Sequence, residues 1–392
     1  GGNGLPCPPT KWHEESMQSP LFFRALGCLM LLVFASCGDS RSAQPVYDFA
    51  SADQIIEGFL TDNPDLEGAG LIIVDREWGV VHHRAFGTFG LDRISLVASS
   101  SKMVTAGILN RLADDGLLDL NQPLQDFLGW KGTYPDVTTA QLLSNSSGLV
   151  GLFPDPAFGP YVCQYLYTGT LLECGKAIFT STRAATDVLP PETTYRYGGG
   201  QWQVAGAVAE AVSEKSWAAL FEEIYTEPCE LESSGFNNHF VQFPSPDLLG
   251  YPAGFEGDPD NLMPTQNPNM EGGLYTTTGD YGKLLLMQLR GGRCDGNFVM
   301  SESSVQRMQT NQIGEVWGGT TGSLWNGYGY GWWVDTEREG WVTDPGAYGS
   351  VPWLDLSRGY GGMLIIEGDS GLGTAMALSA LTAIEEAIDN PS

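Results

Sequence analysis

The chain has 392 residues, of which 42% are hydrophobic and 11 are tryptophans, and it carries a net charge of −28 at pH 7. This apolar content is enough to build a packed interior, which excludes an intrinsically disordered chain. The negative charge repels nucleic-acid phosphates and anionic lipid surfaces, so neither is an expected partner.

The N-terminal residues do not belong to the expected fold. Residues 1–16 look like translated upstream sequence, and residues 17–37 start at Met17 with an Arg24 charge before an apolar run too short to span a bilayer. This pattern is typical of an export signal. The run ends in Phe-Ala-Ser-Cys, similar to a bacterial lipoprotein box, so Cys37 is the expected lipidation site. We expect an exported protein, either a periplasmic or cell-surface lipoprotein or a secreted chain cleaved nearby.

Four cysteines follow the signal: Cys163, Cys174, Cys229 and Cys294. An even number in an exported chain indicates disulfides, and four cysteines permit three pairings. We favour Cys163–Cys174, which closes a short local loop, together with Cys229–Cys294. The cysteine spacing fits no metal motif and the chain has four histidines, so neither a metal site nor a cofactor is expected.

The predicted elements run from strands to helices and back to strands. Residues 68–87 read as two apolar strands around a turn, and the helix after Lys102 ends at Gly116. Residues 201–225 predict two helices separated near 213–216. Further along, residues 276–292 predict a capped helix, β character returns from Tyr328, and residues 373–388 close the chain as a strand or a helix.

This order predicts an α+β fold. One antiparallel sheet, flanked by helices, is built from both chain ends, and a mainly helical domain is inserted between them. The expected sheet domain comprises residues 48–98 and 300–392, and the helical, loop-rich domain comprises residues 99–299.

Three serines followed by a lysine open the first long helix, in the sequence "ASSSKM". Helical residues three apart share a face, so Ser99, and not Ser100 or Ser101, faces Lys102. A serine hydroxyl attacks only after a base takes its proton, and burial lowers the pKa of a lysine toward that role. Ser99 is therefore the candidate nucleophile and Lys102 its partner. By itself the S-x-x-K pattern also occurs by chance, and serine runs are common helix caps.

The S-x-x-K signature and the segments after it resemble the class C β-lactamase-like serine hydrolases. This group includes family VIII carboxylesterases, D-amino-acid peptidases and nylon-oligomer hydrolases. The matching segments are "VTTAQLLSNSSGL", "TTYRYGGGQWQVAG", "NPNMEGGLYTTTGDYGKLL" and "YGYGWWV", and the resemblance spans roughly residues 50–370. It implies a β-lactamase/transpeptidase-like fold and an acyl-enzyme formed on the serine.

The resemblance also implies a catalytic tyrosine. In this family a tyrosine of a Y-x-N triplet relays protons between serine and lysine, and Tyr197 occupies that position. Tyr195 matches the aromatic residue that usually precedes the catalytic tyrosine by two. Gly199 stands at the asparagine position beside the substrate, so the side-chain amide is missing, and Gln201 is a weak candidate to replace it.

The last family element is a K-T-G or H-x-G strand, best matched by "VTDPGAYGS". The match places Asp344 at the cation position and Gly346 at the glycine, where a side chain would block the substrate. The amide of Ala347 joins that of Ser99 in the oxyanion hole. Aromatic residues are expected to line an apolar acyl pocket, although tryptophans more often pack in a core; they are Tyr348, Trp353, Trp325, Trp332 and Trp333.

These departures from the family pattern favour one substrate class. An aspartate at residue 344 would repel a substrate carboxylate, which disfavours β-lactams and D-Ala-D-Ala peptides. We therefore expect a carboxylesterase acting on small neutral or apolar esters. Two alternatives stay open: an amidohydrolase of the β-lactamase, D-aminopeptidase or nylon-oligomer-hydrolase type, and a catalytically silent cell-surface binding protein. Membrane contact is expected only through the lipid on Cys37, and the sequence predicts no oligomeric state.

Overall fold

The computed structural model describes residues 44–243, 250–313 and 325–391. The upstream segment, the export signal and Cys37 lie outside these residues. Within the described ranges, no helix is long and apolar enough to cross a membrane. The same ranges contain no group of three or more His, Cys, Asp or Glu side chains that could hold a metal ion.

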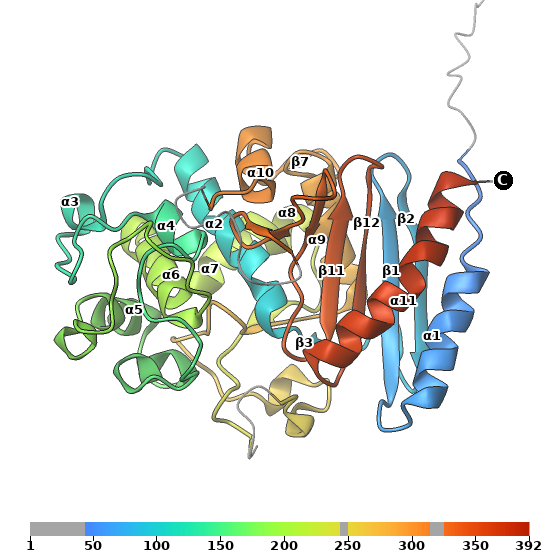
Figure 1. Ribbon diagram of the computed structural model, residues 1–392, viewed down its shortest axis with the longest axis horizontal. Coiled ribbons are helices and arrows are strands. Elements are labelled where there is room, and N and C mark those ends of the chain that lie inside the picture. Colours follow the sequence, from blue (N-terminus) through green and yellow to red (C-terminus); the bar gives the residue numbers. More distant parts are fainter. Residues whose placement is uncertain (1–43, 244–249, 314–324, 392) are drawn as a thin grey trace, which may run out of the picture. The chain divides into compact units, whose positions relative to one another are not determined.

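A seven-stranded sheet forms the centre of the fold, in the order β2-β1-β12-β11-β10-β9-β8. Its neighbouring strands are all antiparallel. Figure 1 shows the two N-terminal strands beside the C-terminal ones, which confirms the predicted sheet built from both chain ends. The strands are β1 (Gly68–Asp75), β2 (Gly79–Gly87), β8 (Gly327–Tyr328), β9 (Trp333–Val334), β10 (Trp341–Thr343), β11 (Ser350–Asp355) and β12 (Tyr360–Ile366).

Side-chain alternation along β1 supplies apolar residues to both faces of the sheet. Leu71 and Ile73 belong to a core shared with α1 (Ala50–Asp62) and α11 (Ser370–Asp389), which cover one face (Figure 1). Their neighbours Ile72 and Val74 belong to the other, larger core. The closing segment of the chain, left open between strand and helix by the sequence, is thus the helix α11.

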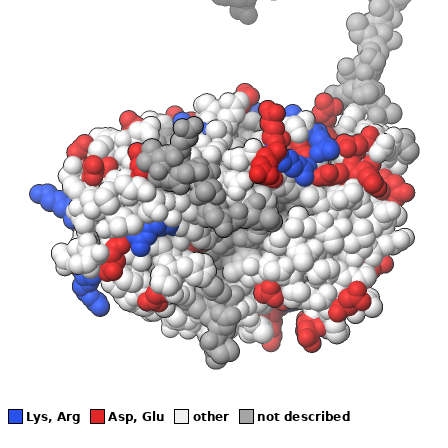
Figure 2. All heavy atoms as spheres, in the orientation of Figure 1, with Lys and Arg blue, Asp and Glu red and all other residues white. Residues whose placement is uncertain are grey.

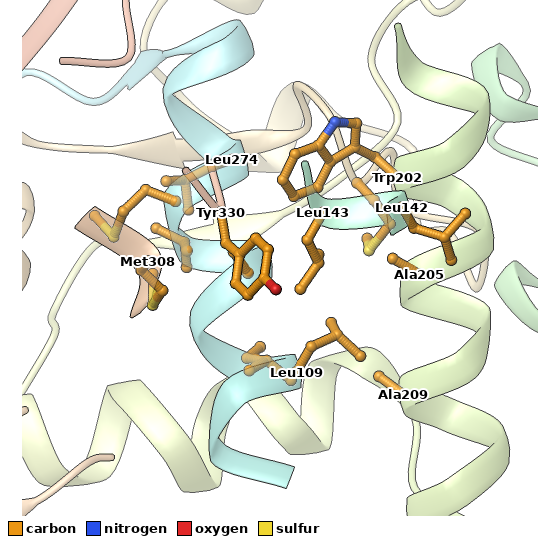
Figure 3. Packing of buried hydrophobic residues seen from close by; sticks show 14 of the residues in the cluster. Leu109, Leu142, Leu143, Trp202, Ala205, Ala209, Leu274, Met308 and Tyr330 are labelled. Atoms are coloured by element: carbon orange, nitrogen blue, oxygen red, sulfur yellow. The ribbon is translucent and has the colours of Figure 1, made fainter. Parts of the chain in front are cut away.

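The larger core joins the other face of the sheet to the helical layer. Figure 3 shows Leu109 of α2 packing near Ala205 and Ala209 of α6, with leucines of α4 beside them. The chain from Gln44 onward forms one compact unit, and the expected division into two domains stays a prediction. The helices on this side are α2 (Ser101–Asp114), α3 (Leu124–Leu128), α4 (Thr139–Leu143), α5 (Leu171–Phe179), α6 (Gly199–Ser213), α7 (Trp217–Phe221), α8 (Glu227–Cys229), α9 (Thr278–Leu289) and α10 (Glu302–Gln309).

Short strands and two disulfides complete the fold. The structure forms Cys163–Cys174 and Cys229–Cys294, the pairing favoured from the sequence. Figure 2 shows acidic side chains spread over the visible face, in keeping with the net charge of −28. The remaining strands are β3 (Ser95–Leu96), β4 (Gly235–Phe236), β5 (Leu274–Thr276), β6 (Arg293–Cys294) and β7 (Asn297–Phe298).

Candidate active site

Ser99 lies in a single 3-10 turn, Ala98–Ser100, between β3 and α2. Ala98 has a φ of 43°, in the left-handed region that a residue with a Cβ adopts only at a cost in backbone strain. Two neighbouring serines hold this turn. The Ser100 hydroxyl donates to the carbonyl oxygen of Asp344 at 2.7 Å, and the Ser101 hydroxyl donates to that of Ala98 at 2.6 Å. Both are fully buried, which leaves Ser99 as the serine that lines a cavity.

Lys102 meets Ser99 as the i,i+3 spacing requires. Its Nζ lies 3.0 Å from the Ser99 Oγ, and it also donates to the backbone carbonyl of Glu271 at 3.0 Å. The ammonium group stands 4.6 Å above the centre of the Tyr197 ring. The lysine is completely buried, so these neighbours set its chemistry.

The pKa of Lys102 is shifted upward, whereas the sequence argument expected burial to shift it downward. Burial acts to lower it, but Tyr197, Glu271 and Asp344 together outweigh burial, and the pKa is raised above its ordinary value. Burial also raises the pKa of Tyr197, against the opposing effect of Lys102. The resting site at neutral pH therefore holds an ammonium and a neutral phenol. The sequence argument failed because it counted burial and not the neighbouring groups, Glu271 among them, that the fold brings to the lysine.

Tyr197, rather than Tyr195, lines the cavity with Ser99. Its ring stacks on Trp333 of β9 with the centroids 5.2 Å apart, which fixes its orientation. Tyr195 lies behind it, with its hydroxyl buried and its ring 5.6 Å from that of Tyr328. Gln201 does not replace the missing asparagine, because its side chain is hydrogen-bonded to Ser147 and Asn145 away from the cavity.

Glu271 is a site residue that the sequence reasoning missed. It precedes β5, which pairs with β3, and this pairing brings it beside the turn that carries Ser99. Its Oε2 lies 3.6 Å from the Lys102 Nζ, and its Oε1 accepts a hydrogen bond from the Tyr165 hydroxyl at 3.3 Å. The one available signal was an acid directly before the Gly-Gly pair in "NMEGG".

The loop between β10 and β11 carries the predicted oxyanion residue. Ala347 lines the cavity opposite Ser99, and neither backbone amide donates a hydrogen bond to any residue that the structure describes. Gly346 packs against the segment before Ser99, where an added Cβ would lie 2.1 Å from the Val97 carbonyl oxygen. Glycine at this position is thus required for the loop to approach the serine. Two amides left unpaired beside a nucleophile suit an oxyanion hole.

The cavity at Ser99 has a volume of about 290 Å³ and mainly apolar walls. Trp325 and Trp333 line it, as expected, and so do Leu152, Phe153 and Phe240. A groove of about 800 Å³ beside α7 is larger, but it contains none of the candidate catalytic residues.

Three expected pocket residues are buried elsewhere. Trp332 is fully buried in the larger core. Trp353 packs between Trp341 and Gly362 of the sheet, because its position in β11 points it toward α11. Tyr348 is buried with its hydroxyl 2.7 Å from the Nε2 of His239, whose pKa burial lowers to about 3. None of the three lines the cavity in the part of the chain that is described.

Asp344 is fully buried and does not line the cavity within the described ranges. Burial raises its pKa well above the ordinary value, which favours the uncharged acid. The carboxylate repulsion argued from the sequence therefore does not follow from this geometry. Of the described residues that line the cavity, none is an arginine, lysine or histidine.

Comparisons with known proteins agree with this geometry. The sequence model of the family described as "Beta-lactamase" matches residues 52–385. The chain is 24% identical over 357 residues to the D-alanyl-D-alanine-carboxypeptidase/endopeptidase AmpH of Escherichia coli strain K12, with 83% of each chain covered.

Solved structures share the fold. EstCE1, described as a hydrolase with promiscuous acyltransferase activity, superposes with a TM-score of 0.70 at 19% identity, over 86% of this chain and 98% of its own. A penicillin-binding protein homologue from Caulobacter crescentus gives a TM-score of 0.67 at 19% identity, over 86% of this chain and 97% of its own. The solved structures that share this fold thus include an acyl-transferring hydrolase and a penicillin-binding protein homologue.

Proposed function

The chain belongs to the beta-lactamase family of serine hydrolases, and on this premise we propose that it is a carboxylesterase for small neutral or apolar esters. One observation carries the proposal. Ser99 and Lys102 meet at 3.0 Å beside a cavity whose described lining is mainly apolar and holds no cationic side chain. A neutral ester can enter such a cavity without leaving a charge unpaired.

The proposed reaction proceeds through an acyl-enzyme. In molecules whose Lys102–Tyr197 pair has first lost a proton to solvent, the Ser99 hydroxyl gives its proton to that pair and its oxygen attacks the ester carbonyl. The oxyanion is held by the amides of Ser99 and Ala347, and the alcohol leaves with a proton returned through Tyr197. Water then attacks the acyl-enzyme by the same route and releases the acid.

The second candidate is an amidohydrolase. It is favoured by the similarity to AmpH, which is described as a carboxypeptidase/endopeptidase. Against it, the cavity offers no cation among its described lining residues to bind a substrate carboxylate. A catalytically silent binding protein is disfavoured by the 3.0 Å contact between Lys102 and Ser99.

A substrate panel separates the three. We expect a fluorophosphonate probe to label Ser99, p-nitrophenyl acetate and butyrate to be hydrolysed, and nitrocefin to be left intact, because a β-lactam carboxylate finds no cationic partner among the described residues that line the cavity. Faster turnover of nitrocefin than of the esters would favour the amidohydrolase. A chain that is neither labelled nor active would be the silent binding protein.

We also propose that the protein is exported and acts on a small-molecule ester, with no nucleic-acid partner. The disulfides Cys163–Cys174 and Cys229–Cys294 suit an oxidising compartment. The net charge of −28 opposes binding to nucleic acids. A lipid on Cys37 would supply the membrane anchor.

Trp325 sets the expected acyl-chain length. A second, apolar cavity of about 20 Å³ lies behind the first, and Trp325 and Thr374 line both. Trp325→Ala removes this wall, and we expect the ratio of octanoate to butyrate hydrolysis to rise about tenfold, since each added methylene gains contact energy in an apolar pocket. The measurement is kcat/KM for p-nitrophenyl esters of rising acyl length.

Leu378→Ala is the matched control for this wall. Leu378 is 46% exposed and lines the small cavity but not the large one, so truncating it opens the small cavity to solvent while Trp325 still separates it from the large one. We expect its acyl-length preference to equal that of the wild type. An unchanged preference in Trp325→Ala would show that acyl chains do not extend toward α11.

A further inference from the structure

Glu271 and Gly199 occupy one space beside the catalytic lysine. Gly199 is the first residue of α6 and is buried. A Cβ built on it would lie 2.0 Å from the Glu271 Oε1 and 2.4 Å from the Gln164 Oε1. Carbon atoms do not approach oxygen that closely, so a side chain at residue 199 and the observed carboxylate exclude each other.

The contacts of Glu271 explain what its carboxylate does there. Lys102 has no exposure to solvent, and a buried ammonium needs a paired, hydrogen-bonded surrounding. Glu271 provides the hydrogen bond through its backbone carbonyl oxygen, 3.0 Å from the Lys102 Nζ. It provides the paired charge through its Oε2, 3.6 Å from the same nitrogen. Tyr165 holds the other carboxylate oxygen by donating a hydrogen bond to Oε1 at 3.3 Å.

Other groups around Lys102 are less able to balance its charge. Tyr197 and Asp344 are the other titratable neighbours, and burial favours the uncharged form of both. The Ser99 hydroxyl is the group to be deprotonated. Glu271 is therefore the carboxylate whose charge and position hold the lysine against the serine.

We propose that Glu271 is the positioning residue of Lys102 and that Gly199 and Glu271 form one unit, in which the carboxylate takes the space of a side chain at residue 199. The inference rests on the proposed function in one respect, that Lys102 activates Ser99. Neither the S-x-x-K pattern nor the position of the tyrosine indicates such a role for Glu271.

The test is a set of variants: Glu271→Ala, Gly199→Asn, and the two combined. Truncating Glu271 releases Lys102, and adding a side chain at Gly199 pushes the carboxylate away. We expect each single change to lower the rate of Ser99 labelling by a fluorophosphonate about 10- to 100-fold, measured on the alkaline plateau where Lys102 is deprotonated in every variant. In the double variant an amide fills the vacated space as a new partner for Lys102. We expect its labelling rate to exceed that of both single variants.

The pH dependence of Ser99 labelling distinguishes a Glu271 that positions Lys102 from one that only stabilises the fold. Glu271 contributes to raising the pKa of Lys102, and a base with a raised pKa becomes active only as the pH rises toward it. The labelling rate of the wild type is thus expected to increase into the alkaline range. In Glu271→Gln, which keeps size and removes charge, the rising limb is expected to move to lower pH. A residue that only stabilised the fold would leave this limb in place.

Glu210→Ala provides the matched control. Glu210 is a partly buried acid of α6 that accepts a hydrogen bond from the Trp217 amide and is not among the described residues that line the cavity. It is expected to label at the wild-type rate. Thermal unfolding of each variant identifies any loss of fold.

Two results would overturn the inference. One is a wild-type labelling rate in Glu271→Ala. The other is a double variant that labels no faster than the slower of the two single variants. Failure of the proposed function looks different: the wild type would be labelled but would not hydrolyse esters, and the comparison among variants would still stand. A wild type that is not labelled overturns both, because Lys102 then activates nothing.

Discussion

Ser99→Ala removes esterase activity, with an expected fall in kcat of about 10⁴-fold or more, because no acyl-enzyme can form without the hydroxyl. The Ser99 side chain contacts Lys102 at 3.0 Å, and the turn itself is held by Ser100 and Ser101, so the fold is expected to survive. The measurements are p-nitrophenyl butyrate hydrolysis, fluorophosphonate labelling and thermal unfolding.

Ser100→Ala is the matched control for the neighbouring hydroxyl. It removes the donor to the Asp344 carbonyl in a fully buried place, so we expect a loss of about 1–3 kcal/mol in the free energy of unfolding. The variant should still be labelled at Ser99. Full activity of Ser99→Ala, or loss of labelling in a folded Ser100→Ala, would contradict the assignment of the nucleophile.

Lys102→Met is expected to lower kcat about 10³-fold, because methionine fills similar space but cannot accept or donate the serine proton. Lys102 is the group that contacts the Ser99 Oγ at 3.0 Å, while its Nζ also fixes the Glu271 carbonyl. The KM for a neutral ester is expected to change little, since the lysine does not line the cavity in the described ranges. Steady-state kinetics on p-nitrophenyl butyrate measure both quantities.

Lys283→Met is the matched control for removing a lysine from an ion pair. Lys283 also pairs at i,i+3 spacing, with Asp280 at 3.1 Å, but on a partly exposed face of α9. The Asp280 carboxylate is buried, but it also accepts hydrogen bonds from the backbone amides of Glu232 and Ser233. Because these bonds remain after Lys283 is removed, the variant is expected to keep both its fold and its kcat. Equal kinetic losses in the two variants would mean that Lys102 acts through stability and not through the serine.

Local geometry explains why much of the fold and part of the site could be predicted. The sheet strands follow from apolar runs bounded by turns, as in β1 and β2. The capped start of α9, where the Thr277 side chain accepts from the Asp280 amide, follows from residues three positions apart. The contact between Ser99 and Lys102 has the same origin, since a helix places i and i+3 together whatever surrounds it.

Properties that depend on distant neighbours could not be predicted in the same way. Asp344 was expected to face the substrate, yet it is buried, because the loop after β10 packs against the segment before Ser99. Among the tryptophans, Trp333 reaches the cavity and Trp353 does not, although both pair with Thr343 across the sheet. Trp333 lies in β9 near the sheet edge, whereas Trp353 lies two strands further in and packs in the core shared with α11.

Residue patterns alone predicted the antiparallel sheet from both chain ends, which is confirmed, and the contact between Ser99 and Lys102, which helical spacing dictates. The role of Ser99 as nucleophile stays a prediction. The charge of that lysine depends on contacts that form only in the folded chain. Lys102 and Glu271 are 169 positions apart, and the pairing of β3 with β5 brings them together in a place without solvent. Electrostatic energy in such a place depends on which charges are close in space, and no local pattern in the chain records that.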